Sequence, residues 1–213
     1  MSSRRISLLD RCISEMDHAL RVVTRDPEQN VDMHADDSNE DKLQPQDKAL
    51  SARLMRVNHS GEVSAQALYR GQALVANSTE QREHLLSAAE EENDHLAWCQ
   101  KRTQDLGGRV SYLTPGWYLG SFAIGVAAGL AGDRTSLGFL AETESQVTEH
   151  LNEHLKRLPV ADKTSHAILN QMREDEVRHG DNATERGAAK LPDPVIRMMR
   201  GASKIMTTLS YRL

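Results

Sequence analysis

The chain has 213 residues, which is enough for one large hydrophobic core and short for two independent domains. Aromatic residues make up 4% of it, and no segment shows sustained alternation of apolar and polar residues, so an all-α fold is favoured. The net charge of −5 comes from interleaved acids and bases without a basic stripe or a zinc-finger motif, which argues against nucleic acid as a partner.

The N-terminal part of the chain divides into a predicted helix and a predicted linker. Residues 1–24 contain an amphipathic helix over 7–24, with one apolar side formed by Leu8, Leu9, Ile13, Met16, Leu20 and Val23. Residues 25–47 are rich in acids and poor in large apolar groups, so they cannot bury enough surface to offset the entropy of ordering. We expect 25–47 to be a mobile acidic linker that leads to a main domain over 48–213.

Four long helical patterns follow and predict a four-helix bundle. Ser78 and Gln81 form a capping-box pattern at the start of the second helix, and Gly107 suits its C-terminal cap. Pro159 ends the third helix. The approximate ranges of the four helices are 49–76, 78–106, 134–158 and 162–187.

Two further segments differ from the bundle helices. Residues 119–132, within a longer segment over 115–132, carry no charge, but fourteen residues are fewer than the roughly 20 that span a bilayer. A last amphipathic helix over 194–210 collects on one face Val195, Met198, Met199, Ala202, Ile205, Met206 and Leu209. Two interpretations stay open for both segments: contact with a membrane interface, and simple cover for the open end of the bundle.

Acids occupy positions on the predicted inward faces that a core would give to apolar residues. On the third helix the apolar seam has a gap of seven residues between Leu140 and Val147, and Glu144 fills it. A carboxylate there costs several kcal/mol unless something pairs with it. Glu62 on the first helix likewise shares a face with Met55 and Tyr69.

Two helices add a Glu-x-x-His pair on the same inward side. A single such pair is normally a solvated surface feature. Here, however, each pair follows a glutamate on the apolar seam of the preceding helix: Glu62 precedes the pair that begins at Glu92, and Glu144 precedes the pair that begins at Glu176. One Glu from each of two helices and Glu-x-x-His from each of the other two is the ligand set of di-iron and di-manganese carboxylate bundles. Mixed oxygen and imidazole ligands suit iron or manganese better than structural zinc. We therefore predict a site for two iron ions formed by Glu62, Glu92, His95, Glu144, Glu176 and His179.

The remaining ionisable residues are given ordinary interpretations. We expect five acids next to the ligands to be solvated: Glu90, Glu91, Asp94, Glu174 and Asp175. Five histidines are expected at the surface: His18, His34, His84, His154 and His166. Roles beside the metal stay open for His59 and His150, and Tyr69 is interpreted as a core residue. Cys12 and Cys99 fit no metal or redox motif, and an acid at Asp10 argues against an N-terminal targeting signal, so a cytosolic protein is expected.

Several motifs together resemble one family. Residues 56–62 read Arg-Val-Asn-His-Ser-Gly-Glu and resemble the R-V-[ND]-H-A-G-E signature of the demethoxyubiquinone hydroxylases of ubiquinone biosynthesis. Residues 92–95 resemble the E-x-D-H motif of that family, 176–179 its second E-x-x-H motif, and 209–213 its C-terminus. Residues 1–24 look like the additional segment of bacterial members. Around Glu144 the chain departs from the family pattern, since Leu151 replaces a tyrosine, and Glu144 rather than Glu142 is the matching ligand.

The resemblance implies a fold, a reaction and a location. It implies a ferritin-like bundle with additional membrane-interfacial helices, and a di-iron monooxygenase that hydroxylates the ring of a polyprenyl demethoxyquinol with O2. The expected partners are the quinol, O2, a membrane lipid surface and other proteins of ubiquinone biosynthesis. The expected location is peripheral and monotopic, on the cytoplasmic face of a bacterial cell membrane, with the apolar segments as anchors.

Two other functions share part of these features. A ferritin-like iron-storage protein has the same ligand set, but it does not explain the apolar segments. A non-enzymatic adaptor for membranes or lipid quinones explains those segments but not six inward ligands. Iron content distinguishes the first two functions from the adaptor, and turnover of a lipid quinol distinguishes the hydroxylase from storage.

Overall fold

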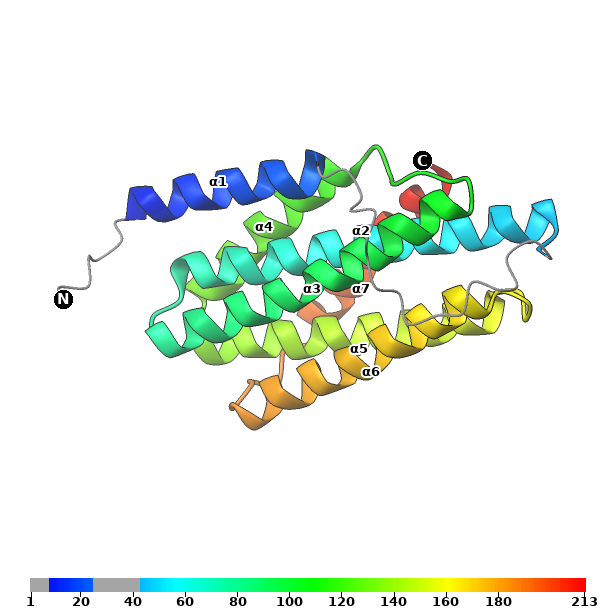
Figure 1. Ribbon diagram of the computed structural model, residues 1–213. Coiled ribbons are helices and arrows are strands. Elements are labelled where there is room, and N and C mark those ends of the chain that lie inside the picture. The colour runs from blue at the N-terminus through cyan, green and yellow to red at the C-terminus, as the bar shows by residue number, and fades with distance from the viewer. Residues whose placement is uncertain (1–7, 25–42) are drawn as a thin grey trace.

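The computed structural model describes residues 8–24 and 43–213, and this part of the chain folds into seven α-helices without a strand (Figure 1). The prediction of an all-α protein is confirmed. In chain order the helices are α1 (Leu8–Thr24), α2 (Pro45–Val75), α3 (Thr79–Asp105), α4 (Thr114–Leu130), α5 (Asp133–Arg157), α6 (Lys163–Glu185) and α7 (Asp193–Arg212).

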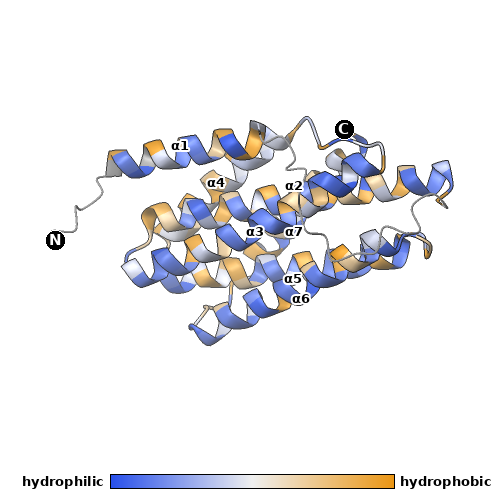
Figure 2. Cartoon of the chain, in the orientation of Figure 1, coloured by the Kyte–Doolittle hydropathy of each residue, from blue (hydrophilic) through white to orange (hydrophobic). Residues whose placement is uncertain are grey.

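The four-helix bundle consists of α2, α3, α5 and α6. Helix α2 lies along α3, and α5 lies along α6, and the two pairs enclose the core. Along these helices hydrophobic and hydrophilic residues alternate in the manner expected for amphipathic helices (Figure 2). The N-terminal cap predicted at Ser78 is present, since its side chain accepts a hydrogen bond from the amide of Gln81. Asp162, near which the fourth helix was expected to begin, is a further cap and accepts a hydrogen bond from the amide of Ser165.

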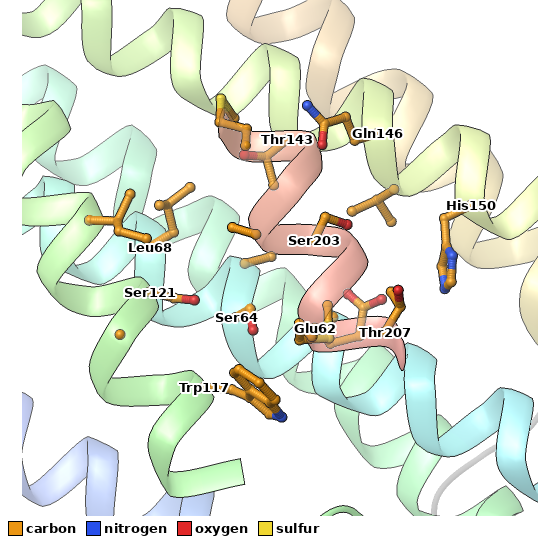
Figure 3. Close-up of a pocket in the computed structure, with 18 of the residues that line it drawn as sticks. Glu62, Ser64, Leu68, Trp117, Ser121, Thr143, Gln146, His150, Ser203 and Thr207 are labelled. Carbon is orange, nitrogen blue, oxygen red and sulfur yellow. The ribbon is translucent and has the colours of Figure 1, made fainter. Parts of the chain in front are cut away.

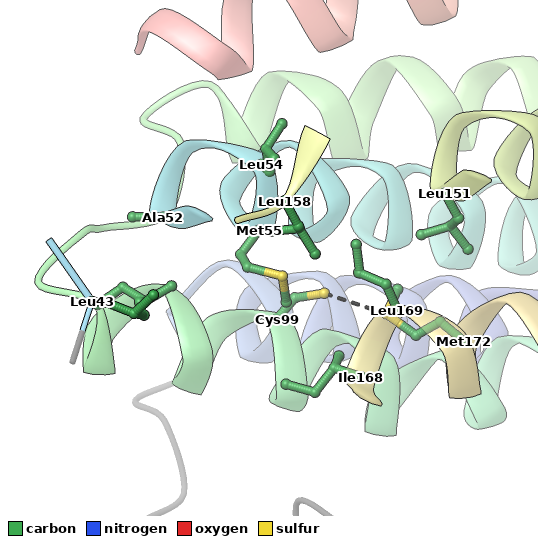
Figure 4. Close-up of a cluster of buried hydrophobic side chains, with 11 residues drawn as sticks. Leu43, Ala52, Leu54, Met55, Cys99, Leu151, Leu158, Ile168, Leu169 and Met172 are labelled. Atoms are coloured by element: carbon green, nitrogen blue, oxygen red, sulfur yellow. Dashed lines mark hydrogen bonds between the residues drawn. The ribbon is translucent and has the colours of Figure 1, made fainter. Parts of the chain in front are cut away.

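Two apolar clusters form the core, one toward each end of the bundle. The first contains Met55, Cys99, Leu151, Leu169 and Met172 (Figure 4), and the Cys99 thiol donates to the Met172 sulfur at 3.7 Å. The second gathers residues from the other end of the same helices: Tyr69, Leu85, Ala89, Leu140 and Ala183. On every bundle helix the predicted metal ligands lie between the residues of the two clusters.

The boundary of the predicted linker is different in the structure. Helix α2 begins at Pro45, inside the range assigned to the linker, and Leu43 is buried in the first apolar cluster. Proline at this position is favourable because its fixed φ suits the first turn of a helix. The rest of the predicted linker, residues 25–42, lies outside the described residues.

Helices α4 and α7 both pack against α2 on one side of the bundle. Helix α4 approaches α2 so closely that a Cβ added at Gly125 would lie 2.1 Å from the Leu68 carbonyl oxygen. The outward sides of the two helices expose large apolar residues, among them Leu119, Leu130, Met198 and Ile205. No described helix is both long and apolar enough to cross a membrane.

Helix α1 lies across α2 and α4 and is held by a buried ion pair. Arg70 Nε donates to Glu15 Oε2 at 2.6 Å. Ala19, Val22 and Val23 of α1 pack on a smaller apolar cluster formed by Val63, Ala67, Leu96 and Tyr118. The predicted helix over 7–24 is thus present. Most of its predicted apolar side faces outward, since four of those residues are exposed: Leu9, Ile13, Met16 and Leu20.

Candidate metal centre

Six side chains meet between the two apolar clusters, and none is more than 6% exposed. Their potential ligand atoms form two groups, each with all atoms within 4.8 Å of one another. One group contains Glu62, Glu92, His95 and Glu176, and the other contains Glu92, Glu144, Glu176 and His179. Glu92 and Glu176 belong to both groups, as bridging carboxylates between two cations would. The structure therefore brings together the six residues that the sequence pattern selects.

The helical spacing explains how the imidazoles face the shared glutamates. Glu92 and His95 are three residues apart on α3, as are Glu176 and His179 on α6, so each pair projects from one face. His95 Nδ1 lies 3.0 Å from Glu92 Oε2 and 3.2 Å from Glu176 Oε1. His179 Nδ1 lies 3.4 Å from Glu176 Oε2 and 3.7 Å from Glu92 Oε1. Both histidines present Nδ1 to the centre.

Several buried atoms of these six side chains lack hydrogen-bond partners among the described residues. Among them are Glu62 Oε2, Glu92 Oε1, Glu144 Oε2, both oxygens of Glu176 and His179 Nδ1. Four carboxylates and two imidazoles in a dry core are unfavourable by themselves, because unpaired buried charge is costly. Two divalent cations would offset the four carboxylate charges and accept these lone pairs. Buried Glu and His groups of this kind can hold a metal, and the mixed oxygen and nitrogen donor set suits iron or manganese.

Protonation balances part of the charge when metal is absent. Burial, reinforced by the Glu176 carboxylate, raises the pKa of Glu92 well above its usual value, and the same two causes raise that of Glu144. Burial alone would lower the pKa of His95, but the carboxylates around it, Asp175 first, raise it well above normal. Glu176 behaves in the opposite way, since contacts with His179 and His95 outweigh burial and lower its pKa to about 2. A cation that bound here would therefore displace protons from this cluster.

Tyr69 is buried, as expected for a core residue, but it also touches the cluster. Its hydroxyl donates to Glu144 Oε1 at 2.5 Å. Burial, and then the carboxylate of Glu144, raise the pKa of Tyr69 well above its usual value, so the phenol keeps its proton. Tyr69 thereby fixes one oxygen of Glu144 and leaves Oε2 free toward the cluster.

Two acids that were expected to be solvated lie against the histidines of the cluster. Asp175 is buried, with Oδ2 at 3.3 Å from His95 Nε2, so the solvated interpretation is wrong for Asp175. Glu91 is half exposed, but its Oε2 lies 2.8 Å from His179 Nε2. Both acids point away from the apolar face of their own helix. Each contacts a histidine of the other helix instead: Asp175 on α6 contacts His95 on α3, and Glu91 on α3 contacts His179 on α6. One feature of the sequence could have indicated these contacts: an acidic residue directly precedes the glutamate of both Glu-x-x-His motifs. The other three acids, Glu90, Asp94 and Glu174, are exposed as predicted.

A family model described as "Ubiquinone biosynthesis protein COQ7" matches residues 49–210. The chain belongs to this COQ7 family. The matched range contains all six residues of the cluster and runs from the beginning of α2 almost to the end of α7. The resemblance seen in the sequence motifs is therefore confirmed.

Several relatives of this COQ7-family chain are similar over nearly their whole length. A protein of Nitrosococcus oceani is 51% identical over 212 residues, 99% of both chains. Proteins of Cupriavidus taiwanensis (52% identical; 96% of this chain and 100% of the relative) and Legionella pneumophila (50%; 98% and 99%) are equally similar. All three relatives carry the name 3-demethoxyubiquinol 3-hydroxylase. The similarity extends to α1, which the COQ7 family match does not include.

An apolar cavity of about 300 Å³ opens beside the cluster of this COQ7-family chain. It lies between α2, α4, α5 and α7, and Glu62 belongs both to the cluster and to the cavity wall (Figure 3). Its lining is mainly apolar, with Trp117, Ile124, Phe139, Val147, Met199 and Met206. A second, polar cavity of about 500 Å³ lies against His179 on the other side of the cluster.

The histidines outside the cluster occupy varied positions in the COQ7-family fold. His154, predicted at the surface, is buried and its Nδ1 lies 2.8 Å from Asn58 Oδ1, which corrects that prediction. His18, His84 and His166 are half-buried, and His34 lies outside the described residues. His59 is buried, and its Nδ1 lacks a hydrogen-bond partner. His150 lines the apolar cavity, where Figure 3 labels it.

Proposed function

We propose that this chain is a di-iron monooxygenase that hydroxylates the ring of a polyprenyl demethoxyquinol with O2 in ubiquinone biosynthesis. The observation that carries the proposal is the contact between a buried four-Glu, two-His cluster and an apolar cavity through Glu62. The names of the relatives give the same substrate class and the same reaction.

In this proposal the six residues are the ligands of two iron ions. Glu62 and His95 would hold one ion, Glu144 and His179 would hold the other, and Glu92 and Glu176 are close enough to contribute to both. Bound iron of this kind supplies the activation of O2. The protein keeps the ligands buried between two apolar clusters, which limits the access of water from the side of the apolar cavity.

The apolar cavity is the proposed place for the quinol ring. Its volume of about 300 Å³ is at the lower end of the range of small-molecule pockets, which suits a single ring rather than a ring with its tail. Polar groups in its wall, such as Gln146 and His150, are available to orient the ring oxygens (Figure 3). Helices α4 and α7 form one side of the cavity, and the proposed path of the isoprenoid tail runs past these two helices.

The outer surfaces of α4 and α7 support the proposal of peripheral binding to the cytoplasmic face of a bacterial cell membrane. Exposed apolar residues of α4 and α7, among them Leu119, Ile124, Met198 and Ile205, suit insertion into the interface. Arg197, Arg200 and Lys204 on α7 are exposed and suit anionic headgroups. The two interpretations of these segments are compatible, because each helix covers the bundle with one side and presents the other side outward.

Oxygen isotope labelling tests the proposed reaction. Iron-loaded protein receives the reduced demethoxyquinone under ¹⁸O₂, and the product is weighed by mass spectrometry. We expect the product to gain a single labelled oxygen: the quinol supplies two electrons and two protons and becomes the quinone, and the second oxygen atom of O2 leaves as water. Iron oxidation with unmodified quinone would favour the storage protein, and absence of bound iron would favour the adaptor.

A pair of variants tests which glutamate of α5, Glu144 or Glu142, is the metal ligand. Glu144→Ala should abolish labelling, because it removes a carboxylate that points into the cluster. Glu142→Ala is the matched control, since Glu142 accepts a hydrogen bond from Gln146 at 2.7 Å and is only half-buried. The reverse result would show that Glu142 is the ligand.

A further inference from the structure

The two histidines of the cluster are braced in a reciprocal way. His95 on α3 contacts Asp175 on α6 through Nε2, at 3.3 Å, and His179 on α6 contacts Glu91 on α3 through Nε2, at 2.8 Å. Each acid directly precedes a shared glutamate of the cluster. Each helix of the α3–α6 pair therefore supplies one histidine and the carboxylate that holds the histidine of the other helix.

This arrangement determines which nitrogen faces the cluster. A carboxylate that accepts a hydrogen bond from Nε2–H fixes the proton on Nε2, so Nδ1 keeps its lone pair. Nδ1 of both rings points to the shared glutamates, at 3.0 Å in His95 and 3.4 Å in His179. Without the acids, either ring could take the other tautomer or turn about its Cβ–Cγ bond. Carboxylates in this position also raise the basicity of a ligating imidazole.

The two braces differ in rigidity. The Asp175 side chain is 12% exposed and is held by Gln171 at 3.2 Å and by Arg178 at 2.7 Å. The Glu91 side chain is 49% exposed and lines the polar cavity, and its distance to Arg178 is 3.7 Å. A buried acceptor that several groups already hold loses less conformational entropy when it accepts a hydrogen bond than an exposed acceptor does. Water also competes less for it.

We propose that Asp175 and Glu91 are positioning residues for the two metal positions, Asp175 for the one with Glu62 and His95 and Glu91 for the one with Glu144 and His179. The position braced by Asp175 is the tighter of the two, and the position beside Glu91 and the polar cavity exchanges its metal more readily. This inference rests on the proposed metal centre. It reverses the sequence-based interpretation of both acids as solvated bystanders.

Cobalt binding separates the two positions without turnover. Metal-free full-length protein is titrated with Co²⁺ against a chelator, which gives two dissociation constants, and anomalous scattering at the cobalt edge gives the occupancy of each position. We expect Asp175→Ala to weaken the Glu62–His95 position by about 10- to 100-fold, the range typical for residues that orient ligating histidines. Glu91→Ala should weaken the other position, by less. Glu174→Ala and Glu90→Ala, which remove exposed acids of the same helices, should leave both constants unchanged.

The conservative variant Asp175→Glu distinguishes positioning from general stability. It restores an acceptor for His95, so it should recover part of the lost affinity and the visible cobalt spectrum, whereas loss of packing alone would not be repaired. If Asp175→Ala does not fold, the Glu91→Ala and Asp175→Glu arms carry the test. Equal weakening of both positions by each variant, or wild-type constants in both, would overturn the inference. Failure of the wild-type protein to bind two Co²⁺ ions would instead refute the metal centre itself.

Discussion

His154 shows how the fold controls a single titratable side chain. Its ring lies against that of His150, with centroids 3.8 Å apart and the planes tilted by 57°, and its Nδ1 lies 2.8 Å from Asn58 Oδ1, so the ring is a donor there. Burial, followed by the neighbouring His150 and Arg157, lowers the pKa of His154 to about 2. The ring is therefore neutral in the folded protein, whereas in the unfolded chain it takes up a proton near pH 6.5.

This difference predicts a loss of stability on acidification. Below pH 6.5 the unfolded state binds a proton that the folded state does not, so at pH 5 His154 should lower the free energy of unfolding by about 2 kcal/mol. Gln at this position can still donate to Asn58 but does not titrate. Between pH 7.5 and pH 5, His154→Gln should gain about 2 kcal/mol relative to the wild-type protein in urea unfolding of the metal-free form. Parallel pH dependence of the two proteins would show that His154 is protonated in the folded state.

The sequence was sufficient to predict that these six residues lie together, but not which neighbouring residues contact them. Glu144 stood out because it interrupts an apolar seam, and the structure places it in the cluster. Asp175 left no such interruption, since its position on α6 is turned away from the seam and its partner His95 comes from another helix. A contact between helices depends on their mutual rotation and distance, which the pattern along one helix does not contain. His154 was missed for the same reason.

At the scale of elements, the packing of α4 on α2 depends on glycines. A Cβ at Gly125 would lie 2.1 Å from the Leu68 carbonyl oxygen, and one at Gly71 would lie 2.3 Å from that of Phe122. The two backbones can approach only because these side chains are absent. This close approach sets one wall of the apolar cavity, which Gly120 and Ile124 line.

Gly125→Ala should therefore separate α4 from α2. We expect a loss of about 1–3 kcal/mol in the free energy of unfolding, the usual cost of overpacking, and a weaker affinity for the quinol. Gly120→Ala is the matched control for stability on the same helix, because a Cβ there meets nothing within 4 Å. It is not a control for quinol affinity, since Gly120 lines the cavity. It should be neutral or stabilise the helix by up to about 1 kcal/mol. Thermal or urea unfolding measures the free energy of unfolding of both variants. Equal changes in the two variants would contradict the role of the close approach of α4 to α2 in stability.

The limits of the bundle helices were predictable to within a few residues, and the packing of α4 was not. Caps, prolines and the apolar period mark where a helix begins and ends, as at Ser78 and Pro159. The uncharged segment 119–132 was identified as unusual, but glycine contacts leave no apolar period that would reveal its partner. The predicted linker ended too late because its acidic composition hid Leu43, whose burial depends on contacts far along the chain.

At the scale of the whole molecule, the cluster lies between an apolar and a polar cavity. The apolar cavity meets it at Glu62, under α4 and α7, and the polar cavity meets it at His179. This arrangement gives the lipid substrate and water-soluble species separate approaches to the centre. The apolar outer sides of α4 and α7 place the proposed membrane contact beside the lipid approach.

Vesicle binding tests this orientation. Ala127→Asp with Ile205→Asp puts two charges on the exposed sides of α4 and α7, so it should release the protein from vesicles that contain anionic lipid. Val160→Asp with Ala161→Asp changes two exposed apolar residues of the α5–α6 connection and should leave binding unchanged. Cosedimentation measures both. Retention of the first variant, or equal release of both, would place the membrane contact elsewhere.

Anomalous diffraction at the iron edge tests the central claim most directly, because it locates the metals without reliance on turnover. In crystals of the iron-loaded protein we predict two peaks, about 3.5–4 Å apart. One should lie among Glu62, Glu92, His95 and Glu176, and the other among Glu92, Glu144, Glu176 and His179. A single peak at full iron loading, or peaks outside these two groups, would contradict the di-iron centre.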